Sequence, residues 1–303
     1  LRLKAVIVGN YALDSNETQK QNLTPVVQYG PMSKDQLSQQ LLIVAKTAAF
    51  RAGEMLIEAF AGNKPTSEKS SRHDLVTEYD HQAERIIIDQ IMGQYPDSTI
   101  LGEEGGSQGS GAVQWFVDPI DGTTNFALGI PFFNVSIAAA LEGEILAGVV
   151  YDPMRQELFA ASRQGAFLND RPIRARQGVA ETEAVLVTDW PYPDYKFTDN
   201  DFLVYSEVVQ RFRAVRRMGS LALEMCYVAC GRVDVCFSLL GKAWDVAAAM
   251  LLLDQAGARY RPIPGLNKGT WPPSKFIASG PDFELEQSSL KFLLRQPFTR
   301  DGL

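Results

Sequence analysis

The sequence predicts a layered fold of the α+β or α/β class, because clusters of short β-like runs alternate with amphipathic helical segments. The length of 303 residues allows one large domain or two smaller ones, and a hydrophobic content of 46% is ordinary for a globular chain. The sequence contains no internal repeat and no low-complexity linker. We therefore expect a globular protein with a sizeable core.

The first half of the chain is expected to hold two long helices and a series of strands. Residues 1–32 are polar and irregular, so we expect them to form an N-terminal extension outside the fold. Ser33 is a suitable N-cap for a helix that runs to about Ala61, and a second helix is expected from about Glu78 to Met92. Strands are expected at Thr99–Leu101, Gln114–Val117, Asn134–Leu141, Ile145–Tyr151 and Glu157–Ala161.

The second half of the chain mixes helices with fewer strands. The longest apolar stretch, Val135–Tyr151, is interrupted by a turn at residues 142–144, so we expect no membrane-spanning segment. Strands are expected at Val233–Leu239 and Lys275–Ala278. Helices are expected near Phe202–Arg211, Leu221–Ala229, Ala243–Ala256 and Phe283–Leu294.

Charge and cysteine content exclude several classes of protein. Lys and Arg number 29 against 36 Asp and Glu, and a net charge of −7 argues against a nucleic-acid polymer as partner while allowing a small anionic substrate. Cys226, Cys230 and Cys236 are too few for a disulfide framework, so reduced thiols in a cytoplasmic protein are expected. With only His73 and His81, a histidine nucleophile mechanism and a histidine-rich zinc site are excluded.

The most informative segment places two carboxylates around a stiff turn. An apolar strand is expected to end at Asp118, since Pro119 cannot donate a ladder hydrogen bond, and Asp121 follows two residues later. Gly122 then gives the backbone the freedom to start a short helix at Thr123. Free amides at a helix start bind phosphate oxygens, and clustered carboxylates bind Mg²⁺.

Two other segments carry acids that could join this group. Glu103 and Glu104 lie in a glycine-bounded loop just after the strand at Thr99–Leu101, and Asp245 stands at the start of the helix expected from Ala243. Acids at turns and helix starts often serve only as caps, and for Asp118 and Asp121 alone this interpretation is about as well supported as a metal site.

The motifs together resemble the signature of the inositol monophosphatase family, whose members are Mg²⁺-dependent, lithium-sensitive phosphatases. The similarity is carried by Glu103, by Asp118-Pro-Ile-Asp-Gly-Thr-Thr-Asn125 and by Trp244-Asp245-Val-Ala-Ala. It extends through Asp74-Leu-Val-Thr77-x-x-Asp80 and Gly129-Ile-Pro-Phe-Phe133 to roughly residues 34–280. The resemblance implies a layered αβαβα sugar-phosphatase fold over residues 33–303, with an N-lobe at about 33–180, a C-lobe at about 181–303, and a homodimer.

The resemblance also implies a set of ligands for two to three Mg²⁺ ions. Glu103, Asp118 and the carbonyl of Ile120 would hold one ion, and Asp118, Asp121 and Asp245 a second. A third, looser ion would share Glu103. Two metals about 4 Å apart polarise the attacking and leaving oxygens together.

The family likeness implies catalysis by water without a covalent intermediate. Thr123, linked to Asp80, would orient the water on the Glu103 metal and accept its proton, although Asp80 could instead serve only as a helix cap. The amides of Gly122 and Thr123 would bind the phosphoryl group. The implied substrate-binding residues are Asp121, Gly122, Thr123, Gly219, Ser220, Leu221, Ser238 and Asp245.

The substrate is less well defined by the sequence. Ser238 stands where inositol-preferring members of the family carry an acid, Leu221 is larger than the residue usual there, and Lys242 adds a cation at the expected pocket mouth. A pocket that lacks a hydroxyl acceptor discriminates weakly among polyols. We expect inositol-1-phosphate or a related sugar or polyol phosphate, with fructose-1,6-bisphosphate, histidinol phosphate and 3′-phosphoadenosine 5′-phosphate as alternatives.

Two other classes of function are alternatives to a phosphatase of the inositol monophosphatase family. A phosphatase of the haloacid dehalogenase type has one residue between its aspartates, whereas two residues separate Asp118 from Asp121. A non-catalytic protein that binds a metal or a sugar phosphate would be expected to lack some ligands, yet all of them are present. The arginines within 171–176 and 211–217 are most simply explained as a solvated surface.

Overall fold

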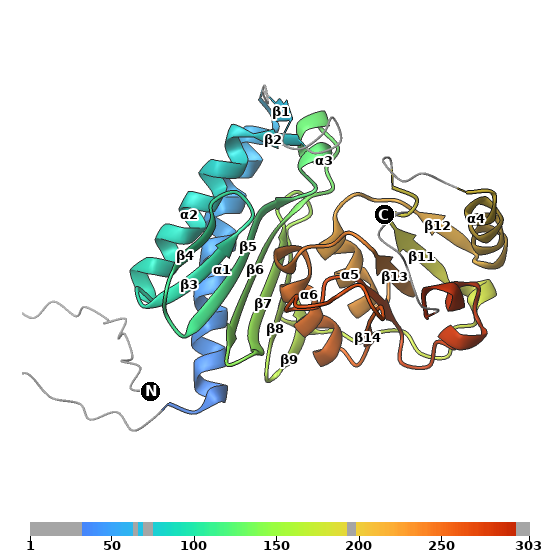
Figure 1. Ribbon diagram of the computed structural model, residues 1–303. Coiled ribbons are helices and arrows are strands. Elements are labelled where there is room, and N and C mark those ends of the chain that lie inside the picture. Colours follow the sequence, from blue (N-terminus) through green and yellow to red (C-terminus); the bar gives the residue numbers. More distant parts are fainter. Residues whose placement is uncertain (1–31, 63–65, 69–74, 193–197, 295–303) are drawn as a thin grey trace, which may run out of the picture.

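The computed structural model describes residues 32–62, 66–68, 75–192 and 198–294. Nearly all of the expected N-terminal extension, together with Asp74, lies outside these ranges. Figure 1 shows two lobes side by side, one built on a large sheet flanked by long helices and one built on a smaller sheet.

Two helices cover the outer face of the large sheet. Helix α1 spans Lys34–Phe60 and helix α2 spans Glu78–Gln94, close to the predicted bounds. The capping box at Ser33, whose hydroxyl accepts the Gln36 amide, explains why α1 begins where the sequence predicts. The apolar faces of both helices join a core that contains Leu41, Ile87 and Trp115.

The large sheet has the strand order β10-β9-β8-β7-β6-β5-β3-β4, in which β3 and β5 are parallel and the other neighbours are antiparallel. A hairpin at Glu142 and Gly143, both with positive φ, joins β6 to β7 as predicted. The strands span Ser98–Gly102 (β3), Gly106–Gly109 (β4), Val113–Asp121 (β5), Asn134–Leu141 (β6), Glu144–Asp152 (β7), Glu157–Ser162 (β8), Gly165–Leu168 (β9) and Arg171–Pro172 (β10).

The small sheet is also mixed, with the order β12-β11-β13-β15-β14. Its strands span Val185–Thr188 (β11), Ala214–Arg216 (β12), Val235–Ser238 (β13), Arg259–Pro262 (β14) and Phe276–Ser279 (β15). The helices of the second half are η1 (Glu181–Glu183), α4 (Asp199–Arg211), α5 (Leu221–Ala229), α6 (Ala243–Gln255), η2 (Leu285–Gln287) and η3 (Ser289–Leu294).

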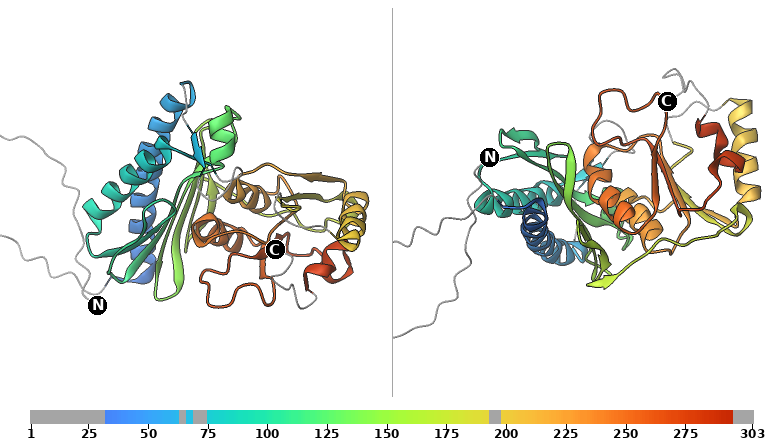
Figure 2. Two further views of the ribbon diagram at one scale, coloured as in Figure 1. Left: turned by 45° about the horizontal axis from the view of Figure 1, so that its top comes forward. Right: turned by 90° about the horizontal axis from the view of Figure 1, so that it is seen from below.

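Five layers follow from these contacts, which confirms the predicted αβαβα arrangement. Helices α5 and α6 form the layer between the two sheets: α6 packs on β5 to β8 of the large sheet and reaches β14, while α5 contacts β6 and β7 on one side and β11, β13 and β15 on the other. Helix α4 and η3 contribute to the apolar cluster on the other face of the small sheet. Figure 2 shows α1 and α2 on one face of the large sheet, and α5 and α6 on the other. The fold is α+β, as predicted.

The predicted helix at Phe283–Leu294 is wrong. The structure has two short 3₁₀ helices there, broken at Ser288. The Ser288 hydroxyl donates to the Leu285 carbonyl and accepts the Leu290 amide, while Ser289 is tied to Glu181 from a distant part of the chain. Serine hydroxyls that replace backbone partners in this way compete with α-helix formation.

None of the helices in the described part of the chain is both long enough and apolar enough to cross a bilayer.

Candidate active site

Strand β5 carries Asp118 and Asp121 on an irregular segment. The predicted end of this strand at Asp118 is wrong: pairing with β6 resumes at Asp121 opposite Asn134, after a register shift between the two aspartates. Pro119 lies within this shift, where a missing amide donor costs no ladder hydrogen bond. The Ile120 amide instead donates to Asp118 Oδ1 at 3.1 Å.

Gly122 turns the chain into the short helix α3 (Thr123–Leu128), and it requires its positive φ of 99°. A Cβ atom there would lie 3.0 Å from the Gly219 carbonyl oxygen, so the glycine also lets the two lobes approach closely. Asn125 secures the same junction, since its Nδ2 donates to the carbonyls of Phe132 and Met218 at 2.8 Å each. The start of α3 is therefore fixed beside the beginning of α5.

Asp121 is the most tightly held carboxylate of the site. Its Oδ2 accepts three hydrogen bonds, from Asn134 Nδ2 (2.7 Å), Ser220 Oγ (2.9 Å) and the Ala222 amide (2.8 Å). Among the described residues its Oδ1 accepts a hydrogen bond only from the Leu221 amide, at 3.0 Å, which leaves a lone pair of this oxygen available. Burial raises the pKa of Asp121, and the hydrogen bonds from these donors oppose the rise.

Asp118 and Asp245 belong to the same electrostatic cluster. Burial raises the pKa of Asp118 well above its usual value, and Glu103, Asp121 and Asp245 raise it further. Burial likewise raises the pKa of Asp245, with added repulsion from Asp121 and Glu103. Asp245 occupies the third position of α6 and accepts the Lys242 amide at 2.8 Å. The structure thus brings together carboxylates from β5, α6 and the β3–β4 turn.

The β3–β4 turn that carries Glu103 is held by Glu84, a residue that the sequence analysis did not identify. Glu84 lies buried on α2, and its Oε1 accepts the Glu104 amide at 3.0 Å while the Gly105 amide also bonds to the carboxylate. A side chain at Gly102 would overlap the Glu84 carboxylate. Because Glu103 hydrogen-bonds to Asp118, fixing this turn aims Glu103 at β5.

Asp80 and Thr123 form a second polar arrangement beside the cluster. Asp80 is fully buried, and its Oδ2 accepts the amide and the hydroxyl of Thr77 in the capping box of α2. Its Oδ1 accepts the Thr123 hydroxyl at 3.1 Å, and the Ile120 carbonyl lies 3.0 Å from that same hydroxyl. Burial raises the pKa of Asp80 to about 6. Asp80 therefore caps helix α2 with Oδ2 and at the same time contacts Thr123 with Oδ1.

The donor set of the cluster suits a hard divalent cation. Within the described residues no Lys, Arg or His nitrogen lies within 4 Å of the carboxylates of Asp118, Asp121 or Asp245. Buried carboxylates without a cation repel one another, whereas oxygen ligands of this kind match Mg²⁺. The carboxylates do not form a preformed coordination site. In the described ranges no three His, Cys, Asp or Glu side chains are positioned to hold one metal ion together.

The remaining predicted substrate residues lie in two places. Ser220 and Leu221 are buried behind Asp121, to which both donate, and Gly219 is exposed at the lobe junction. Ser238 is buried at the end of β13, where its hydroxyl accepts the Gly241 amide at 3.2 Å and hydrogen-bonds to the Tyr192 hydroxyl. The described hydrogen bonds of the Ser238 hydroxyl are thus with the turn after β13 and with Tyr192 rather than with the carboxylates.

Replacing Glu84 by Gln is expected to weaken Mg²⁺ binding about tenfold. Mutations of residues that orient metal ligands lower metal affinity by about 10–100-fold, and we expect the lower value here. The amide nitrogen of Gln cannot accept one of the two turn amides, so the turn loosens and Glu103 loses its orientation. Calorimetric titration with Mg²⁺ measures the change. Glu58→Gln, on the exposed face of α1, is the matched control. Equal Kd values for Glu84→Gln and wild type would contradict this role.

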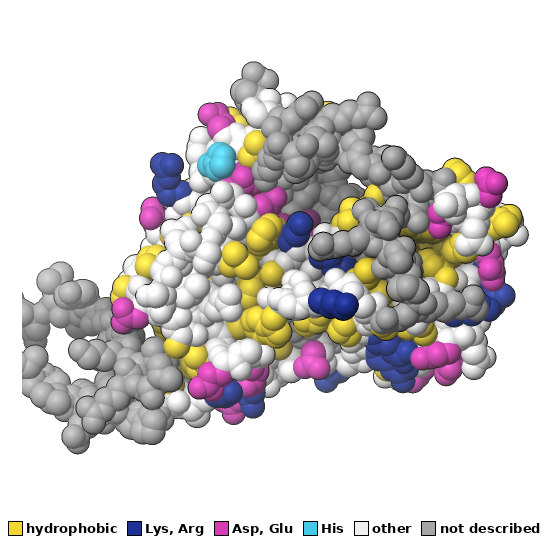
Figure 3. All heavy atoms as spheres, in the orientation of Figure 1, with side chains coloured by type: hydrophobic (Ala, Val, Ile, Leu, Met, Phe, Trp, Pro, Cys, Tyr) yellow, Lys and Arg dark blue, Asp and Glu magenta, His cyan; other side chains and the backbone are white. Residues whose placement is uncertain are grey.

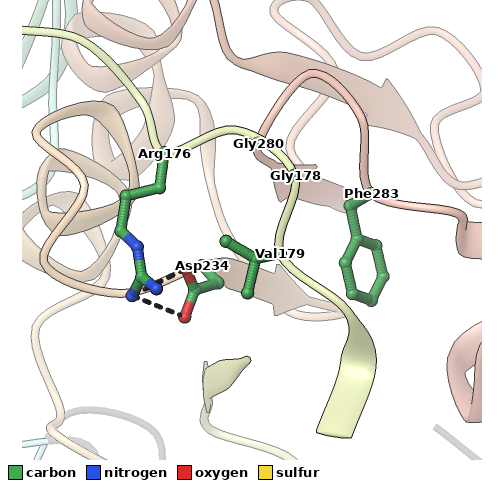
Figure 4. A pocket seen from close by; sticks show the side chains of 6 residues that line it. All are labelled: Arg176, Gly178, Val179, Asp234, Gly280 and Phe283. Atoms are coloured by element: carbon green, nitrogen blue, oxygen red, sulfur yellow. Dashed lines mark hydrogen bonds and ion pairs between the residues drawn. The ribbon is translucent and has the colours of Figure 1, made fainter. Parts of the chain in front are cut away.

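A separate polar contact lies away from the carboxylates. Arg176 Nη1 is 3.2 Å from Asp234 Oδ1, and Asp234 Oδ2 accepts the Val185 amide at 2.8 Å, which ties the segment before β11 to the start of β13. Figure 4 shows this pair beside a small cavity that Val179 and Phe283 help to line. The cavity measures about 10 Å³, room for about one water molecule, so we regard it as a packing feature.

The two mixed sheets, the helices between and outside them, and the carboxylates gathered where the lobes meet define a sugar-phosphatase fold. A family model described as the inositol monophosphatase family matches residues 37–291. The chain belongs to this family of phosphatases, which confirms the resemblance seen in its motifs.

Individual relatives agree with this assignment. The chain is 41% identical over 222 residues to the Nus factor SuhB of Pasteurella multocida, a match that covers 72% of this chain and 83% of the relative. The extragenic suppressor protein SuhB of Bartonella henselae is 33% identical with a TM-score of 0.76, covering 86% of this chain and 100% of that one. The inositol monophosphatase of Anabaena is 30% identical with a TM-score of 0.71, covering 86% and 97%.

Proposed function

We propose that this protein is a Mg²⁺-dependent phosphatase that hydrolyses a small sugar or polyol phosphate, with inositol-1-phosphate as the first substrate to test. One observation carries the proposal: the carboxylates of Asp118, Asp121 and Asp245, from two distant elements, repel one another beside the start of α3. Membership of the inositol monophosphatase family supports it.

The metal ligands in this proposal are those of the family motif. Glu103, Asp118 and the Ile120 carbonyl would hold one ion, and Asp118, Asp121 and Asp245 would hold another, to which Asp121 would offer a remaining lone pair of Oδ1. Bound Mg²⁺ supplies Lewis-acid activation of water and of the phosphoester oxygens.

The chain itself positions the phosphate and handles the proton. The amides of Gly122 and Thr123, at the fixed start of α3, bind phosphoryl oxygens. Thr123 accepts the proton of the attacking water at Oγ1 while passing its own proton to Asp80 Oδ1, 3.1 Å away. The leaving group extends toward Asp245 and the rim formed by residues 219–221.

The direct test is a turnover assay with and without EDTA. Inositol-1-phosphate, fructose-1,6-bisphosphate, histidinol phosphate and 3′-phosphoadenosine 5′-phosphate are compared side by side at fixed Mg²⁺. The proposal expects hydrolysis that EDTA abolishes and Mg²⁺ restores, with no phosphoaspartate trapped. Absence of hydrolysis for every ester would refute the proposed function, and lack of preference for inositol-1-phosphate would remove that substrate.

The pH dependence of the reaction is expected to report Asp80. Since the pKa of Asp80 is raised to about 6, the fraction able to accept a proton falls as the pH drops through 6, and kcat/KM should fall about tenfold per pH unit below that value. Asp80→Asn should lower kcat/KM by a factor of about 10²–10⁴ and abolish the fall of kcat/KM on the acidic side of the pH profile. A pH–rate limb that persists in Asp80→Asn would show that another group titrates.

A second candidate is a role without catalysis, since the bacterial relatives are named Nus factors. The complete set of carboxylates and the Asp80–Thr123 pair favour hydrolysis over this candidate. The EDTA assay separates the two. Dimerisation and a cytoplasmic location stay predictions, and sedimentation analysis tests the first of them.

A further inference from the structure

Lys275 lies at the edge of the small sheet that faces the carboxylate cluster. Strand β15 runs antiparallel to β13, with Phe276 paired to Ser238, so Lys275 precedes β15 at the same edge where β13 ends. The turn from β13 into α6 continues from this edge to Asp245. Topology therefore places the Lys275 side chain beside the turn that carries a proposed metal ligand.

The ammonium group of Lys275 is held by neutral oxygens. Its Nζ donates to the Gly241 carbonyl at 2.8 Å and to Ser274 Oγ at 3.0 Å, and the side chain is partly buried. An ammonium has three N–H donors, so the third has no neutral partner among these contacts. Within the described residues no carboxylate lies within 4 Å of this nitrogen. A partly buried charge of this kind is ready to receive an anion.

A second lysine and the proposed leaving-group rim adjoin Lys275. Lys242 is exposed. Burial lowers the pKa of Lys275, the positive charge of Lys242 lowers it further, and Asp245 opposes both effects. Gly241, which binds the Lys275 ammonium, packs against the Leu221 side chain. Leu221 in turn donates its amide to Asp121. A continuous chain of contacts thus links the lysine to the carboxylates.

We infer that Lys275 and Lys242 form a subsite for a second anionic group on the leaving side of the substrate, such as a second phosphate. This inference rests on the proposed phosphatase function and sharpens it. The carboxylate cluster would hold the metals and the scissile phosphate, while the two ammonium groups, both close enough to Asp245 to affect or feel its charge, would take an anion that remains on the product. Figure 3 shows acidic and basic side chains next to one another near the middle of this face.

Charge decides which substrate gains from this subsite. A polyol with a single phosphate offers only hydroxyls to the two lysines, whereas a sugar bisphosphate offers oxygens that make charge-assisted hydrogen bonds. One such bond contributes about 1.5–3 kcal/mol, which is a factor of about ten or more in kcat/KM. The preferred substrate class is therefore a phosphate ester with a second anionic group, ahead of inositol-1-phosphate.

The test compares two esters that differ only in the second phosphate. Hydrolysis of the 1-phosphate is measured for fructose-1,6-bisphosphate and fructose-1-phosphate, with Mg²⁺ and the full chain. Wild type should show a kcat/KM at least tenfold higher for the bisphosphate, and Lys275→Met should reduce that ratio at least tenfold. Lys275→Arg should retain most of the ratio, since it keeps the charge.

Lys291→Met, an exposed lysine on η3, is the control and should leave the ratio as in wild type. A ratio near one in wild type, or a ratio unaltered by Lys275→Met, overturns the inference while the phosphatase function stands. If wild type hydrolyses neither fructose ester, the four-substrate assay with and without EDTA decides whether the proposed phosphatase function itself fails. Calorimetric binding of fructose-1,6-bisphosphate to wild type and Lys275→Met then decides the inference, and equal Kd values overturn it.

Discussion

Asp118→Asn is expected to abolish hydrolysis and, at the same time, to stabilise the protein in the absence of divalent cations. The rate should fall by about a thousandfold or more, because Asp118 is the proposed ligand shared by two metal ions. The variant should nevertheless fold well. Its amide oxygen can accept the Ile120 amide as Asp118 does, and its amide nitrogen can donate to Glu103.

The gain in stability follows from the sign of the pKa shift. Because the pKa of Asp118 is raised in the folded state, the folded protein binds a proton more tightly than the unfolded chain does. The stability linked to that proton is present at low pH and is lost as the pH rises through the folded pKa. At pH 7 the wild type has therefore lost stability that Asp118→Asn, whose side chain is neutral in both states, retains.

Thermal unfolding in EDTA measures this effect. We expect Asp118→Asn to unfold about 1.5–2 °C above wild type at pH 7, the shift produced by ~1 kcal/mol in a chain of this size, and the difference should shrink at pH 5. Asp89→Asn, an exposed aspartate on α2, is the control. A lower Tm for Asp118→Asn than for wild type at pH 7 would contradict the repulsion described for the cluster.

Asp121→Asn is expected to lose activity to a similar degree but to lose stability as well. The carboxylate of Asp121 accepts four hydrogen bonds from Asn134, Ser220, Leu221 and Ala222. An asparagine must point its amide N–H groups at one or more of these donors, since it has only one oxygen. Leaving buried donors unsatisfied costs about 1–3 kcal/mol.

The contrast between the two aspartates is the informative result. In EDTA the Tm of Asp121→Asn should fall below that of wild type, whereas that of Asp118→Asn should rise. As a control, circular dichroism at 25 °C should show that both variants retain the wild-type helix content. If Asp121→Asn kept wild-type kcat under saturating Mg²⁺, its assignment as a ligand would be wrong.

The sequence predicted the regular parts of the fold well, because their signals are local. Helix α5 and strand β6 have the predicted bounds, and the turn at residues 142–144 needs only two residues with positive φ. The predicted helix at Phe283–Leu294 failed because Ser289 bonds to Glu181, a contact from 108 positions away. Short strands such as β11 and β12 carry too few residues for a clear pattern.

The site was predictable where its residues lie in dense motifs. Asp118, Asp121 and Thr123 stand in one string, and Asp80 and Asp245 begin helices that hydrophobic periodicity predicts. Glu84 and Lys275 lie in ordinary helix and strand surroundings. Their places at the site arise only from the packing of α2 against the β3–β4 turn and of β15 against β13. Long-range pairing of this kind leaves no local sequence signal.

Anomalous diffraction from crystals grown with Mn²⁺ in place of Mg²⁺ tests the central claim most directly. We expect one peak shared by the carboxylates of Glu103 and Asp118 and a second shared by those of Asp118, Asp121 and Asp245. We also expect both peaks to be lost in Asp118→Asn, because Asp118 is the proposed ligand of both ions. Well-ordered crystals in excess Mn²⁺ that show no anomalous peak among these side chains would contradict the account.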